Sequence, residues 1–164
     1  MGKVSPLKDK VILAVDDEPD VLETLEEMLD MCIFDKAKDY DTAKQYLLSY
    51  TYDVVILDIM GVNGFELLKT AVSRNFPTVM LTAHAVTPEA LKKSIKLGAV
   101  FFLSKEQISD LREFLEEVVL NEGKPVWLKF FDRLGEYFNK RFGPDWKEKD
   151  RFFKEFEESL RKSE

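Results

Sequence analysis

The chain has 164 residues, of which 45% are hydrophobic and 34% are charged. This length suits about one domain with a small appendage, and the composition is typical of a globular protein rather than a disordered one. The net charge is −7, with 13 basic and 21 acidic residues in 1–120 but 11 basic and 10 acidic residues in 121–164. This balance argues against nucleic-acid binding, which depends on clustered Lys and Arg side chains.

Membrane insertion and cysteine chemistry are also disfavoured. The longest apolar runs, such as Val11–Val15, are far shorter than the ~20 residues that cross a bilayer, and the first residues lack the apolar stretch of a secretory signal. We therefore expect a cytoplasmic protein with no membrane contact. Cys32 is the single cysteine, which excludes an internal disulfide and a metal site built from cysteines.

Apolar runs alternate with amphipathic stretches over the first 120 residues, as in repeated strand-helix units of a parallel sheet. Near-continuous apolar runs, expected of strands covered on both faces, occupy 11–15, 54–57, 78–81 and 100–103. The more polar segment 33–37 predicts an edge strand. Between these runs apolar residues recur at helical spacing, and Thr87-Pro88-Glu89 marks a helix start. The predicted fold class is α/β with a doubly wound parallel sheet.

Polar residues stand where the predicted central strands end. They are Asp16 and Asp17 after the first strand, Asp58 after the third, Thr82 at the end of the fourth and Lys105 after the fifth. The carboxyl ends of parallel strands border the crevice in which open sheets bind ligands. We therefore expect four separate segments to bring these side chains to one place.

This set of residues, in this order on a five-unit frame, resembles the receiver domain of two-component response regulators. The resemblance implies a five-stranded sheet of order 2-1-3-4-5. It divides the chain into an N-terminal tail at 1–9, a receiver domain at 10–120 and a helical extension at 121–164.

The resemblance also implies a magnesium site. Carboxylates that converge on one pocket repel each other by roughly 4 kcal/mol per close pair at an effective dielectric constant near 20, and a hard divalent cation relieves that repulsion. The implied ligands are the side chains of Asp16, Asp17 and Asp58 and the backbone carbonyl of Met60.

Phosphoryl transfer is the chemistry that the resemblance assigns to this pocket. Asp58 would accept a phosphoryl group from a histidine kinase or a phosphotransfer protein, while Lys105 and Thr82 bind the phosphoryl oxygens. Phe102, three places before the lysine, stands at the position of the aromatic switch residue of receivers. Such a protein is a signalling module and catalyses only its own phosphorylation and dephosphorylation.

Two positions depart from the receiver pattern. The loop at 59–64 is about two residues shorter than usual and lacks a proline. Because its shape therefore differs, the assignment of the Met60 carbonyl as a metal ligand carries over less directly than that of the side-chain ligands. Glu106 replaces the proline that usually follows the lysine. A cis bond before a residue other than proline costs about 3 kcal/mol, so we expect a trans bond here.

Plainer interpretations exist for single residues. The acidic pair Asp16-Asp17 could cap a helix, and Phe102 could be an ordinary core residue. His84, the single histidine, lies two places after Thr82. It lines the mouth of the site or is an exposed loop residue, and we assign it no catalytic role.

Four candidate functions arise from the sequence. The favoured one is a phosphorylation-controlled module that signals through protein-protein contacts. A transcription regulator and a constitutive protein-interaction module are the alternatives, although no basic recognition helix is visible in 121–164. A phosphatase of the haloacid dehalogenase type would need an aspartate two places after Asp58, where Met60 stands.

The extension at 121–164 holds 10 of the 20 aromatic residues. Glycine and proline divide it into two predicted helices, from about 125 to 142 and from about 145 to 161, which could close as a hairpin. Apolar stripes at helical spacing are formed by Trp127, Phe131, Leu134 and Phe138 and by Trp146, Phe153, Phe156 and Leu160. A unit of this size is too small to be stable alone. It therefore packs against the receiver, forms a homodimer or offers an aromatic face to another protein.

Overall fold

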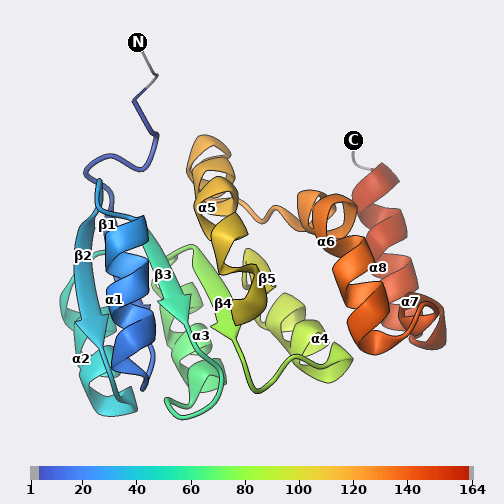
Figure 1. Ribbon diagram of the computed structural model, residues 1–164, viewed down its shortest axis with the longest axis horizontal. Coiled ribbons are helices and arrows are strands. Elements are labelled where there is room, and N and C mark those ends of the chain that lie inside the picture. The colour runs from blue at the N-terminus through green and yellow to red at the C-terminus, as the bar shows by residue number, and fades with distance from the viewer. Residues whose placement is uncertain (1–3, 163–164) are drawn as a thin grey trace.

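The structure is a computed structural model that describes residues 4–162. A five-stranded parallel sheet of order β2-β1-β3-β4-β5 forms its centre (Figure 1). The strands are β1 (Val11–Val15), β2 (Ile33–Ala37), β3 (Val54–Leu57), β4 (Thr78–Thr82) and β5 (Phe101–Ser104). The predicted fold class, the strand order and the edge position of β2 are confirmed.

The helices of this α/β unit alternate with the strands. They are α1 (Pro19–Met28), α2 (Tyr40–Ser49), α3 (Gly64–Ser73), α4 (Pro88–Leu97), the 3₁₀ helix η1 (Lys105–Asp110) and α5 (Leu111–Leu120). In Figure 1, α1 lies on one face of the sheet and α2 and α3 on the other. The predicted start of α4 is confirmed: the Thr87 hydroxyl accepts a hydrogen bond from the Ala90 amide at 3.1 Å, and Pro88 follows it.

The core lies on both faces of the sheet, because every residue of β3, β4 and β5 is buried. Burial of one large apolar side chain contributes roughly 1.5–3 kcal/mol, so these strands contribute substantially to the stability. Leu7, before β1, is also fully buried. Within residues 4–162, no helix has both the length and the apolar character that a membrane crossing needs.

The C-terminal segment forms α6 (Trp127–Phe142), α7 (Trp146–Lys149) and α8 (Arg151–Lys162). The prediction of one continuous helix from about 145 to 161 is wrong, because the backbone is extended at Asp150. One carboxylate oxygen of Asp150 accepts a hydrogen bond from the Phe152 amide at 2.9 Å, and the other pairs with Lys92 of α4 at 2.9 Å. Asp150 therefore caps α8 and ties its start to α4.

The three C-terminal helices lie beyond β5, at the edge of the sheet opposite β2 (Figure 1). The Val126 amide donates to the carbonyl of Val100 at 3.0 Å, and the Trp127 indole donates to the carbonyl of Ala99 at 3.1 Å. The first predicted stripe is buried throughout, together with Phe130. Of the second stripe, Trp146 and Phe153 are buried, whereas Phe156 and Leu160 are partly exposed. The extension thus packs against its own receiver and covers the edge of β5.

Candidate functional site

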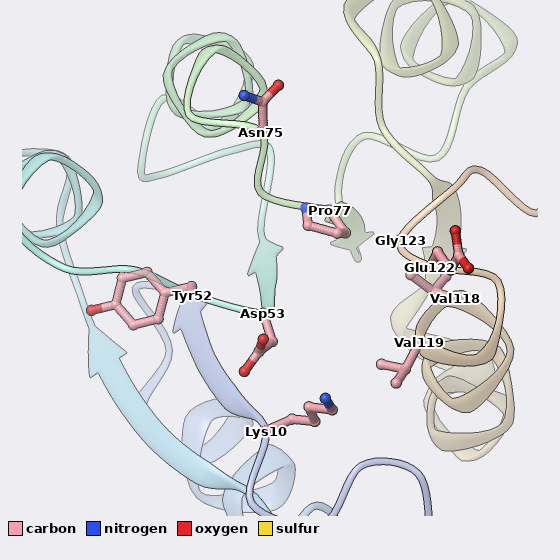
Figure 2. Close-up of a pocket in the computed structure, with 9 residues that line it drawn as sticks. All are labelled: Lys10, Tyr52, Asp53, Asn75, Pro77, Val118, Val119, Glu122 and Gly123. Carbon is pink, nitrogen blue, oxygen red and sulfur yellow. The ribbon is translucent and has the colours of Figure 1, made fainter.

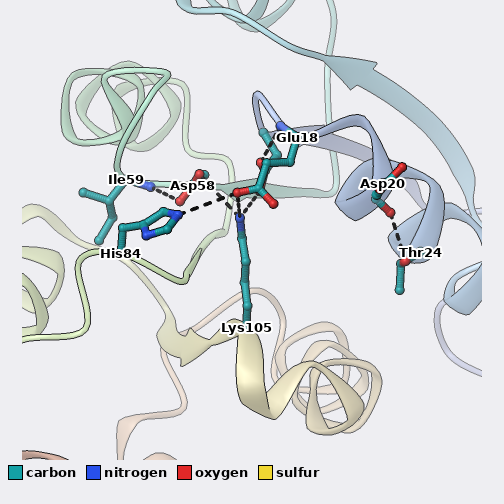
Figure 3. Close-up of polar contacts among 8 residues, drawn as sticks. Glu18, Asp20, Thr24, Asp58, Ile59, His84 and Lys105 are labelled. Carbon is teal, nitrogen blue, oxygen red and sulfur yellow. Dashed lines mark hydrogen bonds and ion pairs between the residues drawn. The ribbon is translucent and has the colours of Figure 1, made fainter.

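The polar residues at the carboxyl ends of the strands meet as the sequence predicts. Asp16 follows β1, Asp58 follows β3, Thr82 ends β4 and Lys105 follows β5. Figure 3 shows Lys105 reaching toward Asp58 and Glu18. The ammonium nitrogen of Lys105 lies 2.8 Å from an oxygen of Asp16, 3.6 Å from one of Asp58 and 3.7 Å from one of Glu18. Three segments that are distant in the sequence therefore form one charged cluster.

Two buried carboxylates lie at the centre of the cluster. Asp16 and Asp58 are each only 2% exposed. Burial raises the pKa of Asp58, and the negative charge of Asp16 raises it further, against the opposing effect of Lys105. Burial also raises the pKa of Asp16, although contacts with Lys105 and with the Glu18 amide lower it. A second positive charge in the pocket would relieve both carboxylates.

The ammonium of Lys105 stays protonated in this pocket. Burial alone would lower the pKa of Lys105, but the carboxylates of Asp16, Asp58 and Glu18 outweigh burial and raise it. Its charge therefore remains available to bind an anionic group that arrives at Asp58.

The two oxygens of Asp58 have different surroundings. Oδ1 accepts a hydrogen bond from the Ile59 amide at 2.8 Å, whereas Oδ2 is the oxygen nearest Lys105. The backbone thus fixes the carboxylate through Oδ1, and Oδ2 is the oxygen placed to react beside a positive charge.

Thr82 contributes a buried hydroxyl. The residue is fully buried, and among the described residues its Oγ1 has no hydrogen-bond partner, although the nearby hydroxyl lowers the pKa of Asp58. A buried hydroxyl without a partner costs roughly 1–3 kcal/mol. Such a group is typical of a position where a ligand supplies the missing partner.

The loop between β3 and α3 packs closely against the acidic cluster. Gly61 has a φ of +83°, and a Cβ atom at this position would overlap the carboxylate of Asp17. A Cβ atom on Gly64 would overlap the carbonyl of Asp58. The short loop therefore depends on glycine at both positions to fit around the aspartates.

The chemistry of the donors fits a hard divalent cation. One carboxylate oxygen from each of Asp16, Asp17 and Glu18 lies within 4.8 Å of the others, and Asp17 and Glu18 are exposed. Asp58 lies outside this group of three but shares Lys105 with Asp16. Oxygen ligands in an open acidic pocket suit Mg2+, which keeps several waters. Glu18 was missed in the sequence analysis, and its position directly after the acidic pair was the available signal.

The other predicted positions lie around this cluster. The Met60 side chain is 54% exposed, and the role of its carbonyl stays a prediction. His84 is exposed, with its Nε2 3.8 Å from an oxygen of Glu18, which places it at the mouth of the site (Figure 3). Phe102 is fully buried, and its ring centroid lies 6.1 Å from that of Phe138 in α6. Its role as a switch also stays a prediction.

A separate pocket of about 320 Å³ lies at the amino ends of the strands (Figure 2). Lys10, Asp53 and Pro77, which precede β1, β3 and β4, line it together with the end of α5. The carboxylate of Asp53 is engaged there by the Val11 amide at 2.8 Å. This pocket is at the opposite end of the sheet from Asp58 and contains none of the predicted site residues.

Comparisons with known proteins agree with the geometry. The family model of the response regulator receiver domain matches residues 12–116. The two-component response regulator ARR18 of Arabidopsis thaliana is 29% identical over 114 residues, which cover 66% of this chain and 18% of that protein. The response regulator GtcR of Aneurinibacillus migulanus is 32% identical over 101 residues, covering 58% of this chain and 41% of GtcR. The chain thus matches less than half the length of these relatives.

Solved structures share the fold. A Francisella response regulator 1452 receiver domain superposes with a TM-score of 0.62 at 22% identity, covering 71% of this chain and all of the other. A response regulator from Burkholderia pseudomallei, solved with a phosphorylated aspartic acid, a calcium ion and citrate, has a TM-score of 0.58 at 22% identity and covers 70% of this chain and 72% of its own. With its receiver-type sheet, its acidic cluster and the family match over residues 12–116, this chain belongs to the response regulator receiver domain family.

Proposed function

We propose that this receiver accepts a phosphoryl group on Asp58 from a histidine kinase or a phosphotransfer protein and signals through altered protein-protein contacts. One observation carries the proposal: Asp58 is buried with one oxygen fixed by the Ile59 amide and the other beside Lys105. The Burkholderia pseudomallei regulator, which has the same fold and a phosphorylated aspartic acid, supports it.

Each residue of the pocket has a part in the proposed transfer. Oδ2 of Asp58 attacks phosphorus, and the bond from phosphorus to the donor breaks with its electron pair leaving on the donor. Lys105 neutralises one phosphoryl oxygen, and the unpartnered hydroxyl of Thr82 donates to another. Mg2+, when held by Asp16, Asp17 and Asp58, with the Met60 carbonyl as a further ligand, supplies the remaining positive charge. Hydrolysis of the same bond would end the signal.

Beryllofluoride, a mimic of the phosphoryl group, tests the proposal. Wild-type protein should gain thermal stability from beryllofluoride with Mg2+, because the mimic occupies the pocket only in the folded state. Asp58→Asn should gain none, since it lacks the oxygen that coordinates beryllium. An equal gain in both proteins would show that the mimic binds elsewhere.

The output is proposed to be protein contact rather than DNA binding. Two basic side chains of α6 face acidic side chains of the receiver: Arg133 pairs with Glu113 at 2.6 Å, and Lys129 pairs with Glu113 and Glu117 at 3.3 and 3.6 Å. These charges are already paired within the chain. A gel-shift assay at low salt should therefore show no saturable binding, and saturable binding would favour a transcription regulator.

A further inference from the structure

The segment that carries Lys105 is held by contacts within the receiver and by contacts with α6. On the receiver side, the hydroxyl of Ser104 accepts a hydrogen bond from the Glu106 amide at 3.2 Å, which closes a turn around Lys105. The peptide bond after Lys105 is trans, as expected, since the described residues contain no cis bond. Glu106 stands where receivers usually carry a proline, and its side chain makes contacts that a proline could not.

Helix α6 uses that side chain. The Tyr137 hydroxyl donates to one carboxylate oxygen of Glu106 at 3.2 Å, and the Arg141 guanidinium binds the other at 3.1 Å. Next to this contact, the ring of Phe138 covers Phe102, so that residues on both sides of Lys105 contact α6. The extension thus holds the β5–η1 junction from outside the receiver.

We propose that Glu106, held by Tyr137 and Arg141 of α6, is a positioning residue that keeps Lys105 at the phosphoryl site. The inference rests on the proposed function. The ammonium of Lys105 must reach an anion on Asp58. The next residue in the chain, Glu106, is bound by α6, which restrains the backbone that carries Lys105. Helix α6 is a permanent part of the fold, because its aromatic contact with β5 is buried. The rings that form this core are each at most 1% exposed: Phe102, Phe130 and Phe138. A fixed junction lowers the entropy lost when the anion binds.

The same helix supplies a matched control. Arg133 binds Glu113 of α5 through both guanidinium nitrogens at 2.6 and 3.0 Å, and its exposure, 49%, resembles the 39% of Arg141. Both are partly exposed ion pairs between α6 and the receiver, so their loss should lower stability by similar small amounts. Only Glu106, the partner of Arg141, is adjacent to Lys105.

The test measures the affinity of the full chain for beryllofluoride in the presence of Mg2+. The double variant Tyr137→Phe/Arg141→Ala should bind the mimic about two- to fivefold more weakly, as expected for the loss of exposed polar contacts, whereas Arg133→Ala should bind it as the wild type does. A double variant with Arg141→Lys in place of Arg141→Ala should regain part of the lost affinity. Amide exchange of η1, measured without Mg2+ or mimic, should accelerate in the double variant and not in Arg133→Ala.

The outcomes separate the two proposals. Equal affinities in the wild type and the double variant, or an equal loss in Arg133→Ala, would overturn the positioning role and leave Asp58 as the acceptor. A double variant that binds the mimic more tightly would also overturn it, because α6 would then restrain the site. A wild type that does not bind the mimic at all would overturn the proposed function, and the positioning role would fall with it.

Discussion

Asp58 and Asp16 show how single residues give this pocket its chemistry. Both carboxylates are buried side by side, and burial is the main reason that their pKa values are raised. An isolated buried charge of this kind is costly. Lys105 offsets part of the cost, and a cation and a phosphoryl group would complete the set of charges.

We expect Asp58→Asn to stabilise the metal-free protein at neutral pH. A raised pKa means that the folded state binds the proton more tightly than the unfolded state, so the free energy of unfolding falls as pH rises from the ordinary value of 3.8 through the raised pKa. Asparagine removes this dependence. Urea unfolding in EDTA from acid to neutral pH measures both effects, and a variant less stable than the wild type at neutral pH would contradict the argument.

Asp17 tests the metal site. Mg2+ should raise the melting temperature of the wild type, because it binds the folded acidic cluster, and Asp17→Asn should abolish that rise. Asp20→Asn, an exposed aspartate of α1 outside the cluster, is the matched control and should retain the rise. An equal rise in Asp17→Asn and the wild type would place the cation elsewhere.

The helices and strands differ in how far the sequence determines them. Four of the five strands were predictable because their apolar runs are continuous, and the polar site residues were predictable because they stand at strand ends. The break at Asp150 was not, since the charged stretch around it suits a helix, and the kink depends on the capping hydrogen bond to the Phe152 amide and on the pairing with Lys92 of α4. The contact of Glu106 with α6 was not predictable either, because it joins residues that are 31 and 35 positions apart in the sequence.

Asp150 offers a test at the level of one helix. Asp150→Ala removes the cap of α8 and should lower the free energy of unfolding by about 1 kcal/mol. Asp150→Asn keeps a capping oxygen and loses only the partly exposed pair with Lys92, which is worth at most ~1 kcal/mol and typically a few tenths. Urea denaturation compares the two, and equal losses would mean that the ion pair, not the cap, stabilises α8.

At the scale of the whole molecule, the extension and the receiver form one body. Aromatic rings of α6 and α8 pack on one another, and a ring of α6 also packs on β5. Acidic residues of α5 pair with basic residues of α6. Apolar burial contributes most of this stability, because exposed ion pairs are individually worth about 0–1 kcal/mol. Of the three roles that the sequence left open for 121–164, packing against the receiver is the one that the structure shows.

The oligomeric state depends on how much apolar surface the C-terminal helices leave exposed. Among the described residues, the large hydrophobic side chains with high exposure all lie outside 121–162. A homodimer through the C-terminal helices would therefore have little free apolar surface, and we expect a monomer without a phosphoryl group. Light scattering of the full chain should give the monomer mass, and a dimer under these conditions would contradict this expectation.

Covalent labelling shows whether Asp58 is the residue that accepts the phosphoryl group. The full chain is incubated with acetyl phosphate and Mg2+, its intact mass is measured, and the modified peptide is mapped. The wild type should gain one phosphoryl group, carried by Asp58, and Asp58→Asn should gain none. A wild type that stays unlabelled, or an Asp58→Asn variant that is labelled on another residue, would contradict the assignment of Asp58 as the acceptor.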